Sequence, residues 1–362
     1  MRRLIAAVCA AGLGAALSVG SAASASAASK TIVVGPGQSI QAAVNRANPG
    51  DTVLVKPGVY HQGVQIRTSH ITLRGSGDFR GGTVLEPPAS PAKTLCNRLN
   101  RGATGVCVLA TRVNPKTGEV ITPVSNVTVT ALVVTGFPAS GVFGYGTDDL
   151  RVTRVAAIND GAYGISRFES EETVFANDIA IGNDEAGFYV GDSPFADTVV
   201  RGNLAIGNQF GIFIRHARHV TVTGNHIRGN CQGILVLDDG ERGGAGNATI
   251  EHNSVNKNNK LCPPSEDAPA LQGGGILLLG ATHTLVAGNS VAGNTGKQIN
   301  SGGIVVASAK PLGGRSDPNF DTIAHNTAFR DHPADLLWDG TGTGVTFTGN
   351  HCATSLPAGL CH

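Results

Sequence analysis

Between residues 198 and 308 the chain repeats one pattern of short apolar strands separated by Gly-Asn pairs. The pattern is clearest in TVVRGNLAIGNQFGIFIRH (198–216), VTVTGNHIRGNCQGILVLD (220–238) and TLVAGNSVAGN (284–294), the last followed by GGIVVAS (302–308). Each unit contains a strand, a Gly-Asn turn, a second short strand, another Gly-Asn turn, and a strand that begins with Gly-Ile or its equivalent. Because no unit contains a ten-residue helical pattern, the repeat predicts stacked β-strands and excludes a helical solenoid.

The first Asn of the unit recurs at positions 203, 225, 253, 289, 326 and 350. The shortest steps are 22 and 24 residues, and the longer steps indicate one repeated coil that carries loop insertions. Three short strands per coil are typical of a parallel β-helix, whose coils bury their apolar faces by stacking. Asn tolerates left-handed turns and its amide bonds to stacked Asn neighbours, so we expect an Asn ladder from Asn203 to Asn350.

The segment that precedes these units has its own pattern. Residues 31–66 read TIVVGPGQSIQAAVNRANPGDTVLVKPGVYHQGVQI and contain one expected helix, from about Ile40 to Ala47, with Ser39 as its N-cap. This segment, the following ITLRGSG and the later GNxxxGN…GIxV units resemble the pectate-lyase-like superfamily and NosD-type repeat proteins. The resemblance implies an all-β, right-handed parallel β-helix over residues 28–362, with the helix as an N-terminal cap. The resemblance identifies the fold but says little about the function, because proteins with this fold catalyse several different reactions.

Residues 1–27 have the pattern of an export signal. Arg2 and Arg3 precede an apolar stretch, and ASA at 25–27 matches a cleavage site. We therefore expect a secreted protein that makes no membrane contact after signal removal. Loss of Arg2 and Arg3 moves the formal net charge from +1 to −1, so nucleic acid is not an expected partner. The 50 glycines and the 5% aromatic content favour one turn-rich domain over two ordinary ones.

Six cysteines remain after this signal, an even number in an exported chain. No Cys or His spacing matches a zinc site, so we assign no zinc ligands. Six cysteines allow fifteen sets of three disulfides, and proximity in sequence is the basis for choosing among them. The pairs predicted in this way are Cys96–Cys107, Cys231–Cys262 and Cys352–Cys361.

Loop insertions are predicted at about 86–124, 238–248, 259–273 and 309–321. Two of them follow the Gly-Ile strand and one precedes it, so the insertions flank this strand on both sides. In β-helix enzymes of the kind that the chain resembles, the substrate lies in a groove along one sheet between such loops. The outer face of the Gly-Ile strands is therefore the predicted site.

Aligned on their first Gly, these strands carry ionisable residues at the sixth position of four successive coils. The sixth position holds Glu169, Asp192, His216, Asp238, Gly280 and Ser308. Neighbouring coils stack about 4.8 Å apart, so the first four side chains and Arg215 form a candidate catalytic group. We assign substrate binding to Arg167, Tyr189 and Asp239, which lie close to this stripe. The structural alternative is a row of turn formers, since Asp and Gly are common at strand ends.

A polysaccharide lyase or uronate epimerase is the first function that fits the stripe. Its chemistry needs a cation to neutralise the uronate carboxylate, from Arg215 or Arg167, and a base or acid, from His216 or Tyr189. Calcium is the one candidate cofactor that could replace the arginine. Its ligands would be Asp192, Asp238 and Asp239.

Two other functions stay open. An inverting glycoside hydrolase could use Asp192 and Asp238, which are two coils and about 9.6 Å apart by stacking. A non-catalytic surface-binding or NosD-like accessory protein would need no such pair. Asp184 and Glu185 fall in turns that we place away from the proposed face. The leading hypothesis is a secreted, monomeric, carbohydrate-active protein whose partner is a polysaccharide.

Overall fold

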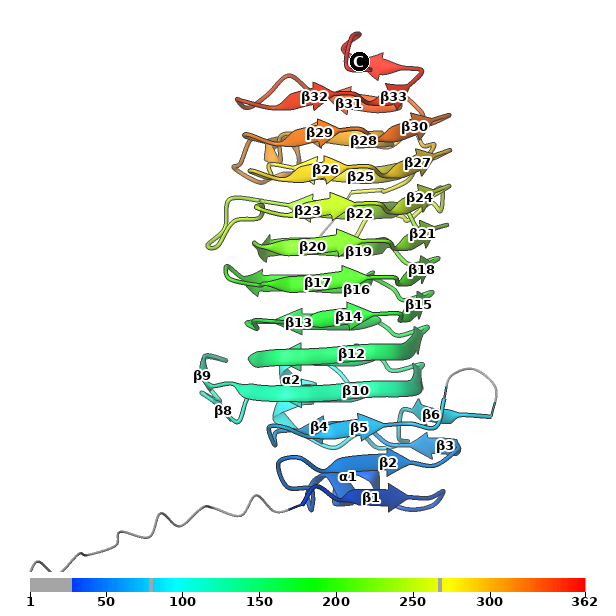
Figure 1. The fold of residues 1–362 in the computed structure, drawn as a ribbon, viewed down its shortest axis with the longest axis vertical. Helices are drawn as coiled ribbons and strands as arrows, with labels where there is room; N and C mark the ends of the chain where they lie inside the picture. Colours follow the sequence, from blue (N-terminus) through cyan, green and yellow to red (C-terminus); the bar gives the residue numbers. More distant parts are fainter. Residues whose placement is uncertain (1–27, 78–80, 266–268, 362) are drawn as a thin grey trace, which may run out of the picture.

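The computed structural model describes residues 28–77, 81–265 and 269–361, and it is a right-handed parallel β-helix (Figure 1). The coils lie one above another from the N-terminal end, in blue, to the C-terminal end, in red. The predicted export signal at residues 1–27 lies outside the described residues. In the ranges that are described, no helix is long and apolar enough to cross a membrane.

Two parallel sheets run along the stack, with 21 and 11 strands in the described part of the chain. The larger sheet contains two faces of each coil. In β10 (Val124–Thr135) and β12 (Thr147–Ile158) a single strand continues around the corner between these faces, with left-handed Ala131 and Arg154 at the bend. In later coils a turn at this corner divides the strand in two.

The remaining strands of the larger sheet are β1 (Thr31–Val34), β2 (Thr52–Val55), β3 (Gly58–His61), β5 (Thr72–Arg74), β6 (Thr83–Glu86), β14 (Val174–Ala176), β15 (Ile179–Ile181), β17 (Thr198–Arg201), β18 (Leu204–Ile206), β20 (Val220–Thr223), β21 (His226–Arg228), β23 (Thr249–Glu251), β24 (Ser254–Asn256), β26 (Leu285–Ala287), β27 (Ser290–Ala292), β29 (Thr322–Ala324), β30 (Thr327–Phe329), β32 (Thr346–Thr348) and β33 (His351–Cys352). The smaller sheet comprises β4 (Val64–Ile66), β7 (Val106–Leu109), β11 (Val142–Tyr145), β13 (Ile165–Phe168), β16 (Ala186–Ser193), β19 (Phe210–Ala217), β22 (Gln232–Leu237), β25 (Gly274–Leu279), β28 (Gly302–Ala307), β31 (Leu336–Trp338) and β34 (Ser355–Leu356).

The Gly-Ile strands alternate between the interior and the outer face of the smaller sheet. In-register pairing places equivalent residues of neighbouring strands side by side, because these residues have the same spacing from the first Gly of each strand. The inward row is Ile165, Phe188, Ile212, Ile234, Ile276 and Ile304, all fully buried. The outward row is Tyr189, Phe213, Leu235, Leu277 and Val305, which is buried under loops rather than in the main core.

The predicted Asn ladder from Asn203 to Asn350 is confirmed. Each side-chain oxygen accepts the backbone N–H of the preceding ladder residue, as in Asn203 N to Asn225 Oδ1 at 2.9 Å and Asn225 N to Asn253 Oδ1 at 3.0 Å. The second Gly-Asn of the repeat forms another ladder with the same geometry. Its members are Asn183, Asn208, Asn230, Asn258 and Asn294, and it ends on Asp331.

Asp331 places a carboxyl group where the ladder would otherwise have an amide. Its Oδ1 accepts the backbone and side-chain N–H groups of Asn294 at 2.7 and 2.8 Å, while its buried Oδ2 has no hydrogen-bond partner among the described residues. Burial raises the pKa of Asp331 to about 7, against the opposing bonds from Asn294. The folded pKa therefore lies above the unfolded value of about 3.9, so the contribution of this group to stability is complete below about pH 4 and is lost as the pH rises through about 7.

Asp331→Asn is expected to raise the melting temperature at pH 8 and to change it little at pH 4. Removing the buried charge stabilises the fold at pH 8 by on the order of 4 kcal/mol, the free-energy equivalent of the pKa shift. The Nδ2 group of the new asparagine would replace the unpaired Oδ2 of Asp331. It could donate to a backbone carbonyl in the way that Asn294 Nδ2 donates to Val255 O at 3.1 Å. Thermal unfolding between pH 4 and 8 tests this. The control is Asp149→Asn, which removes a surface acid paired with Arg151; an equal gain in both variants would contradict the explanation.

The predicted N-terminal helix is present as α1 (Ile40–Val44), which ends three residues earlier than expected. Ser39 caps it, since its Oγ accepts the N–H of Ala42 at 3.1 Å. Ile40, Ala43 and Val44 are buried against the first coils, at the blue end of Figure 1.

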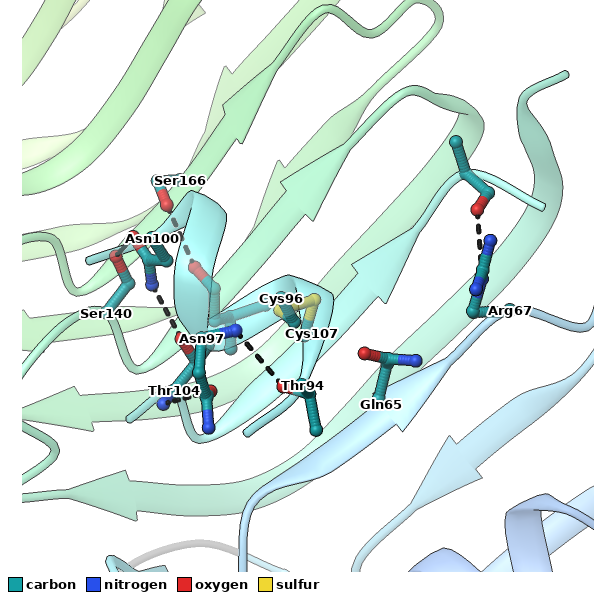
Figure 2. The surroundings of a disulfide bond; sticks show 12 residues. Gln65, Arg67, Thr94, Cys96, Asn97, Asn100, Thr104, Cys107, Ser140 and Ser166 are labelled. Atoms are coloured by element: carbon teal, nitrogen blue, oxygen red, sulfur yellow. Dashed lines mark hydrogen bonds between the residues drawn. A yellow bond between two sulfur atoms is a disulfide. The ribbon is translucent and has the colours of Figure 1, made fainter. Parts of the chain in front are cut away.

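The segment 86–124 is only partly an insertion, because it includes β7, a regular strand that pairs with β4 and β11. Around β7 it adds α2 (Leu95–Leu99) and the antiparallel pair β8 (Arg112–Val113) and β9 (Val120–Thr122). The Cys96–Cys107 disulfide ties α2 to β7 (Figure 2). All three predicted disulfides are present. The Tyr145 hydroxyl of β11 donates to Gly118 O at 2.7 Å, so the β8–β9 hairpin lies against the outer face of the smaller sheet.

Candidate functional site

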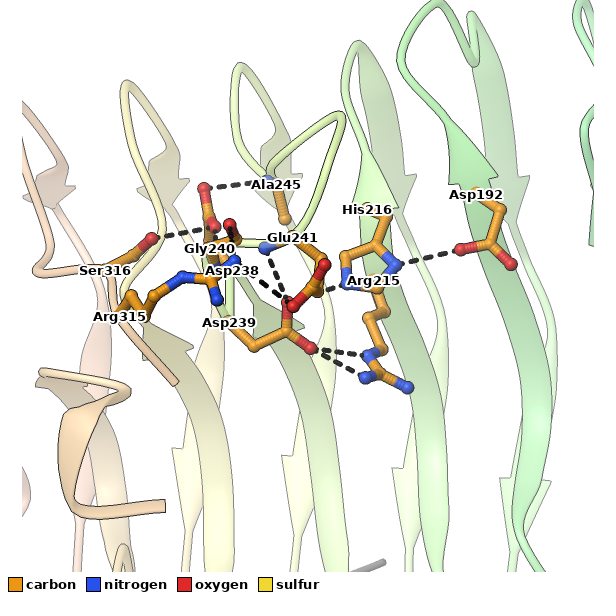
Figure 3. Close-up of polar contacts among 10 residues, drawn as sticks. All are labelled: Asp192, Arg215, His216, Asp238, Asp239, Gly240, Glu241, Ala245, Arg315 and Ser316. Atoms are coloured by element: carbon orange, nitrogen blue, oxygen red, sulfur yellow. Dashed lines mark hydrogen bonds and ion pairs between the residues drawn. The ribbon is translucent and has the colours of Figure 1, made fainter. Parts of the chain in front are cut away.

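Three residues of the predicted stripe share a left-handed backbone. Glu169, Asp192 and His216 have φ angles of 47°, 50° and 51°. The pairing of Gly191 with Arg215 and of Ser193 with Ala217 places Asp192 beside His216 in adjacent coils. The left-handed turn directs these side chains away from the regular strand, as Figure 3 shows for Asp192 and His216. The comparison of the Gly-Ile strands with one another, aligned on their first Gly, therefore correctly predicts that these residues share one edge of the smaller sheet.

His216 lies between two carboxylates. Its Nδ1 is 2.8 Å from Asp192 Oδ1 and its Nε2 is 2.7 Å from Asp239 Oδ1 (Figure 3). The bond to Asp192 raises the pKa of His216, and the bond to Asp239 adds to this against the effect of burial. Because a carboxylate accepts at each nitrogen, this geometry favours the imidazolium form of the ring, in which both nitrogens donate. A general-base role for His216, which the sequence left open, does not fit because neither nitrogen is free to accept a proton.

Arg215 neutralises the second carboxylate. Its Nε and Nη2 donate to Asp239 Oδ2 at 3.0 and 2.7 Å, and Asp239 Oδ1 also accepts the N–H of Glu241 at 3.1 Å. Burial would raise the pKa of Asp239, but the bonds from Arg215 and His216 outweigh it and lower that pKa. Arg215 and Asp239 thus fix His216 from one side, and their charges largely cancel.

Asp238 turns away from this cluster, which corrects its predicted catalytic role. It is 5% exposed, and its backbone lacks the left-handed φ of its neighbours in the stripe. Its Oδ1 accepts from Gly240 N and Ser316 Oγ, and its Oδ2 accepts from Ala245 N, so it is a turn former. The inverting pair and the calcium site that needed Asp238 are therefore not assembled. No group of three or more His, Cys, Asp or Glu side chains in the described ranges is arranged to hold a metal ion.

Arg167 lies in the interior, so the prediction that it binds substrate is wrong. Its strand keeps the register of its neighbours, and Arg167 pairs with inward-facing Val190. The side chain is 0% exposed, and its Nη2 donates to Ala196 O at 2.7 Å and Thr198 Oγ1 at 2.8 Å. Burial lowers the pKa of Arg167 to about 9. Gly144, the paired residue in the preceding strand, leaves space for this large side chain.

Glu169 and Asp192 form a carboxyl pair on adjacent coils. Partial burial raises the pKa of Glu169, and the nearby Asp192 raises it further, against the effect of Arg242. Asp192 uses Oδ1 for His216, while no contact is recorded for its Oδ2 within the described part of the chain. The Asp192 side chain is 43% exposed. Both carboxyl groups are thus accessible to a ligand, and the pKa of Glu169 is raised above its ordinary value.

Tyr189 extends its phenol across the face of β16 toward Asp192, whose charge acts on it. A Cβ built on Gly191 would lie 2.2 Å from Tyr189 Cε1 and 2.4 Å from its hydroxyl oxygen, so the ring lies directly over Gly191. Phe168 and Tyr163 hold the ring, with centroids 4.7 and 4.5 Å away. Burial raises the pKa of Tyr189, as does the charge of Asp192. The phenol therefore stays protonated and can donate a hydrogen bond.

Gly191→Ala is expected to displace the Tyr189 phenol and to lower activity or ligand affinity at the Glu169–Asp192 pair by at least about tenfold, the loss from one hydrogen bond to a charged or reacting group. The fold should survive because φ at Gly191 is not in the left-handed region. Melting temperature and binding should be measured together. Gly35→Ala is the matched control, since Gln38 Oε1 at 3.6 Å is the one recorded neighbour of its Cβ. Unchanged binding in Gly191→Ala would show that the phenol has no role.

A pocket of about 510 Å³ opens beside the cluster on the same outer face. Arg215 and Asp239 form part of its edge, so the pocket and the cluster are continuous. Its floor is apolar and comes from the outward rows of β19, β22 and β25. Its walls come from the predicted insertions near 259–273 and 309–321, which confirms that these loops flank the Gly-Ile strands. Residues that line it include Phe213, Leu235, Leu279, Leu271, Leu312 and Arg315.

The sequence did not identify several residues of this face. Asp184 and Glu185 line the pocket, which corrects their placement away from it. Tyr163 donates to Glu185 Oε1 at 2.8 Å and covers Tyr189. These residues precede the Gly-Ile strands, where the repeat gives no sign of side-chain direction. The isolated Gly191 within a row of large side chains was the available signal for the position of Tyr189.

Comparisons with known proteins agree with this architecture. A sequence family described as a right handed beta helix region matches residues 111–242. No curated protein matches the chain. The A-module of mannuronan C-5 epimerase AlgE6 from Azotobacter vinelandii has a similar structure, with a TM-score of 0.57 and 19% identity over 86% of this chain and 88% of that one.

Two further solved structures are similar. DFA-IIIase from Arthrobacter chlorophenolicus A6, in complex with GF2, has a TM-score of 0.57 and 13% identity over 87% of this chain and 77% of that one. A PL6 alginate lyase in complex with a trisaccharide has a TM-score of 0.54 and 15% identity over 86% of this chain and 75% of that one. At these identities the likeness establishes the right-handed β-helix fold that they share.

Proposed function

We propose that this chain is an exported, carbohydrate-active protein that hydrolyses glycosidic bonds on the outer face of its smaller sheet. Glu169 is the proton donor and Asp192 the second carboxyl group. The observation that carries this proposal is the pairing of two accessible carboxyl groups on adjacent coils: partial desolvation and Asp192 raise the pKa of Glu169, while His216 anchors Asp192. Two carboxyl groups in different environments are the usual acid and nucleophile of a glycosidase.

The spacing of the coils favours retention of configuration. Adjacent coils are about 4.8 Å apart, close to the 5–5.5 Å between carboxyl groups in retaining enzymes and below the 6.5–9.5 Å of inverting ones. Asp192 would attack the anomeric carbon while Glu169 protonates the departing glycosidic oxygen. Glu169, now ionised, would then take a proton from water, and the resulting attack would release the sugar from Asp192. The imidazolium of His216 keeps Asp192 in position.

Other observations support a glycan as the ligand. The half-buried aromatic rings of Tyr163 and Phe168 provide flat apolar surface next to the carboxyl pair, a surface to which a sugar ring can pack. Proteins with a similar fold include a mannuronan C-5 epimerase, an alginate lyase bound to a trisaccharide and DFA-IIIase bound to GF2. Three disulfides support export, since such bonds persist in oxidising compartments.

A uronate lyase or epimerase is the second candidate, and Arg242 favours it. No ion pair or hydrogen bond is recorded for this exposed side chain in the described residues, yet its charge acts on Glu169. Arg242 could bind a uronate carboxylate, and Tyr189 could donate a proton. Against this candidate, His216 is blocked at both nitrogens, and the phenol of Tyr189 is held protonated, so neither supplies the required strong base.

The proposal is tested by incubating the mature protein with fructans, xylans, β-glucans, pectate and alginate. Reducing-sugar release without ultraviolet absorbance from an unsaturated product supports hydrolysis. Absorbance from the unsaturated product would support elimination instead, and altered uronate composition by NMR would support epimerisation. Failure to change any polymer would count against an enzyme and favour a binding protein.

A further inference from the structure

The pocket beside the cluster contains a buried amide without a partner. Gln232 begins β22 and is 1% exposed, and its Nε2 is buried with no hydrogen-bond partner among the described residues. Gln232 is one of the residues that line the pocket. A buried donor without an acceptor costs free energy, so its retention at a pocket wall points to a ligand oxygen that completes the bond.

The side of the pocket toward the C-terminal coils is closed by a loop that reaches back over one coil. Arg315, which follows the short helix η1 (Lys310–Leu312), donates from its backbone N to Asp239 O at 2.9 Å and from Nη2 to Gly240 O at 2.8 Å. Ser316 Oγ donates to Asp238 Oδ1 at 2.9 Å. These bonds join the segment after β28 to the segment after β22, as Figure 3 shows, and so enclose the outer face of β25.

Described residues of the loop before β25 are also held in place. The Cys231–Cys262 disulfide ties the loop before β25 to the start of β22, and Cys262 and Leu271 exchange backbone hydrogen bonds of 3.0 Å in both directions. Leu271 contributes to the wall of the pocket. On the outer face of β25, Leu277 and Leu279 are 0% and 2% exposed, so little of this face is open to a ligand beyond the pocket, whereas Asp192 on the other side is accessible.

The combination of an apolar floor, a rim of polar groups and one orphaned donor suits a sugar ring, which has apolar faces and hydroxyl edges. Phe213 and Leu235 form the floor, and Arg215, Asp239 and Arg315 lie on the rim. Arg215 pairs with Asp239 and Arg315 pairs with Glu241, so most charges on the rim are already neutralised. The pocket therefore does not require a highly charged ligand.

We infer that this pocket binds the terminal residue of a glycan, with Gln232 Nε2 donating to a sugar hydroxyl and the rest of the chain extending over Asp192 toward Glu169. The protein then acts at chain ends or on short oligosaccharides rather than within long polymers. This inference rests on the proposed glycan function and specifies the form of its substrate.

The test uses short fructo-, xylo-, cello- and alginate oligosaccharides together with the corresponding polymers. Binding is measured by calorimetry on full-length mature Glu169→Gln and on the same protein with Gln232→Met. The second substitution should weaken oligosaccharide binding by about ten- to a hundredfold, the loss of one buried hydrogen bond. It should not lower the melting temperature, because no hydrogen bond to the Gln232 side chain is recorded in the described residues. Gln38→Met, far from the pocket, is the control.

The products of the active protein complete the test. Release of one small product from the start of the reaction, together with the loss of affinity in Gln232→Met, supports the inference. Early products of many sizes, with unchanged affinity in Gln232→Met, would overturn it while leaving the hydrolase proposal intact. Binding that depends on Gln232 without any cleavage would support the pocket and reject the hydrolase. Absence of binding to every oligosaccharide would overturn the inference.

Discussion

Glu169→Gln is expected to lower the rate of glycosidic bond hydrolysis by about a hundredfold to ten-thousandfold, the usual contribution of a positioned proton donor. Gln keeps the size of the side chain but cannot supply a proton to the leaving oxygen. Asp192→Asn should have an effect at least as large, because it removes the group that attacks the sugar and leaves one ring nitrogen of His216 without its carboxylate.

The two losses should differ in their dependence on the leaving group. A substrate with an activated aryl leaving group needs no proton, so it should restore much of the first step in Glu169→Gln but not in Asp192→Asn. Glu172→Gln is the matched control, since it changes an exposed glutamate three residues away in the same turn region. Activity close to that of the native protein in either Glu169→Gln or Asp192→Asn would remove that residue from the mechanism.

Asn225→Ala is expected to produce a large loss of stability. The side chain accepts from Asn203 N at 2.9 Å and donates to Val200 O at 2.9 Å and to Asn253 Oδ1 at 2.9 Å. Alanine leaves at least one buried donor and one buried acceptor unpaired in the middle of the stack, and the two together cost about 4 kcal/mol.

Because each coil contacts only its neighbours, this loss should also weaken the coupling between the two halves of the stack. Thermal unfolding and hydrogen exchange of the amides near Asn203 measure both effects. Asn256→Ala is the control, because its side chain bonds to Ser254 Oγ at the partly exposed surface. If Asn225→Ala were no more destabilising than Asn256→Ala, the ladder would not be a main source of stability.

The repeat predicted the scaffold well because each coil of the fold repeats the same spacing of strands and turns. Spacing between Gly-Asn pairs determines which Asn side chains stack, so Asn203 and Asn350 could be assigned to one ladder without coordinates. The disulfides followed from proximity along the chain, since each closes a local loop. The same periodicity placed Glu169, Asp192 and His216 on one edge, because these residues share a left-handed turn at the strand end.

The failures occur where the direction of one side chain decides its role. Asp238 and Asp239 are neighbours of the same type, yet only Asp239 contacts His216, because an insertion follows and Asp238 supports its turn. Arg167 points inward because Gly144 leaves space for it, a relation between coils that the single strand does not reveal. The pocket depends on loops that reach across coils, such as the segment with Arg315, so its lining could not be assigned from the repeat.

The central claim is that Glu169 and Asp192, one coil apart, act together on a glycosidic bond. Proton NMR of the first sugar released, recorded before its anomers equilibrate, tests this claim most directly on any glycan that the protein cleaves. Carboxyl groups on adjacent coils predict a product that retains the anomeric configuration of the substrate. A product of inverted configuration, or an unsaturated product, would contradict the claim.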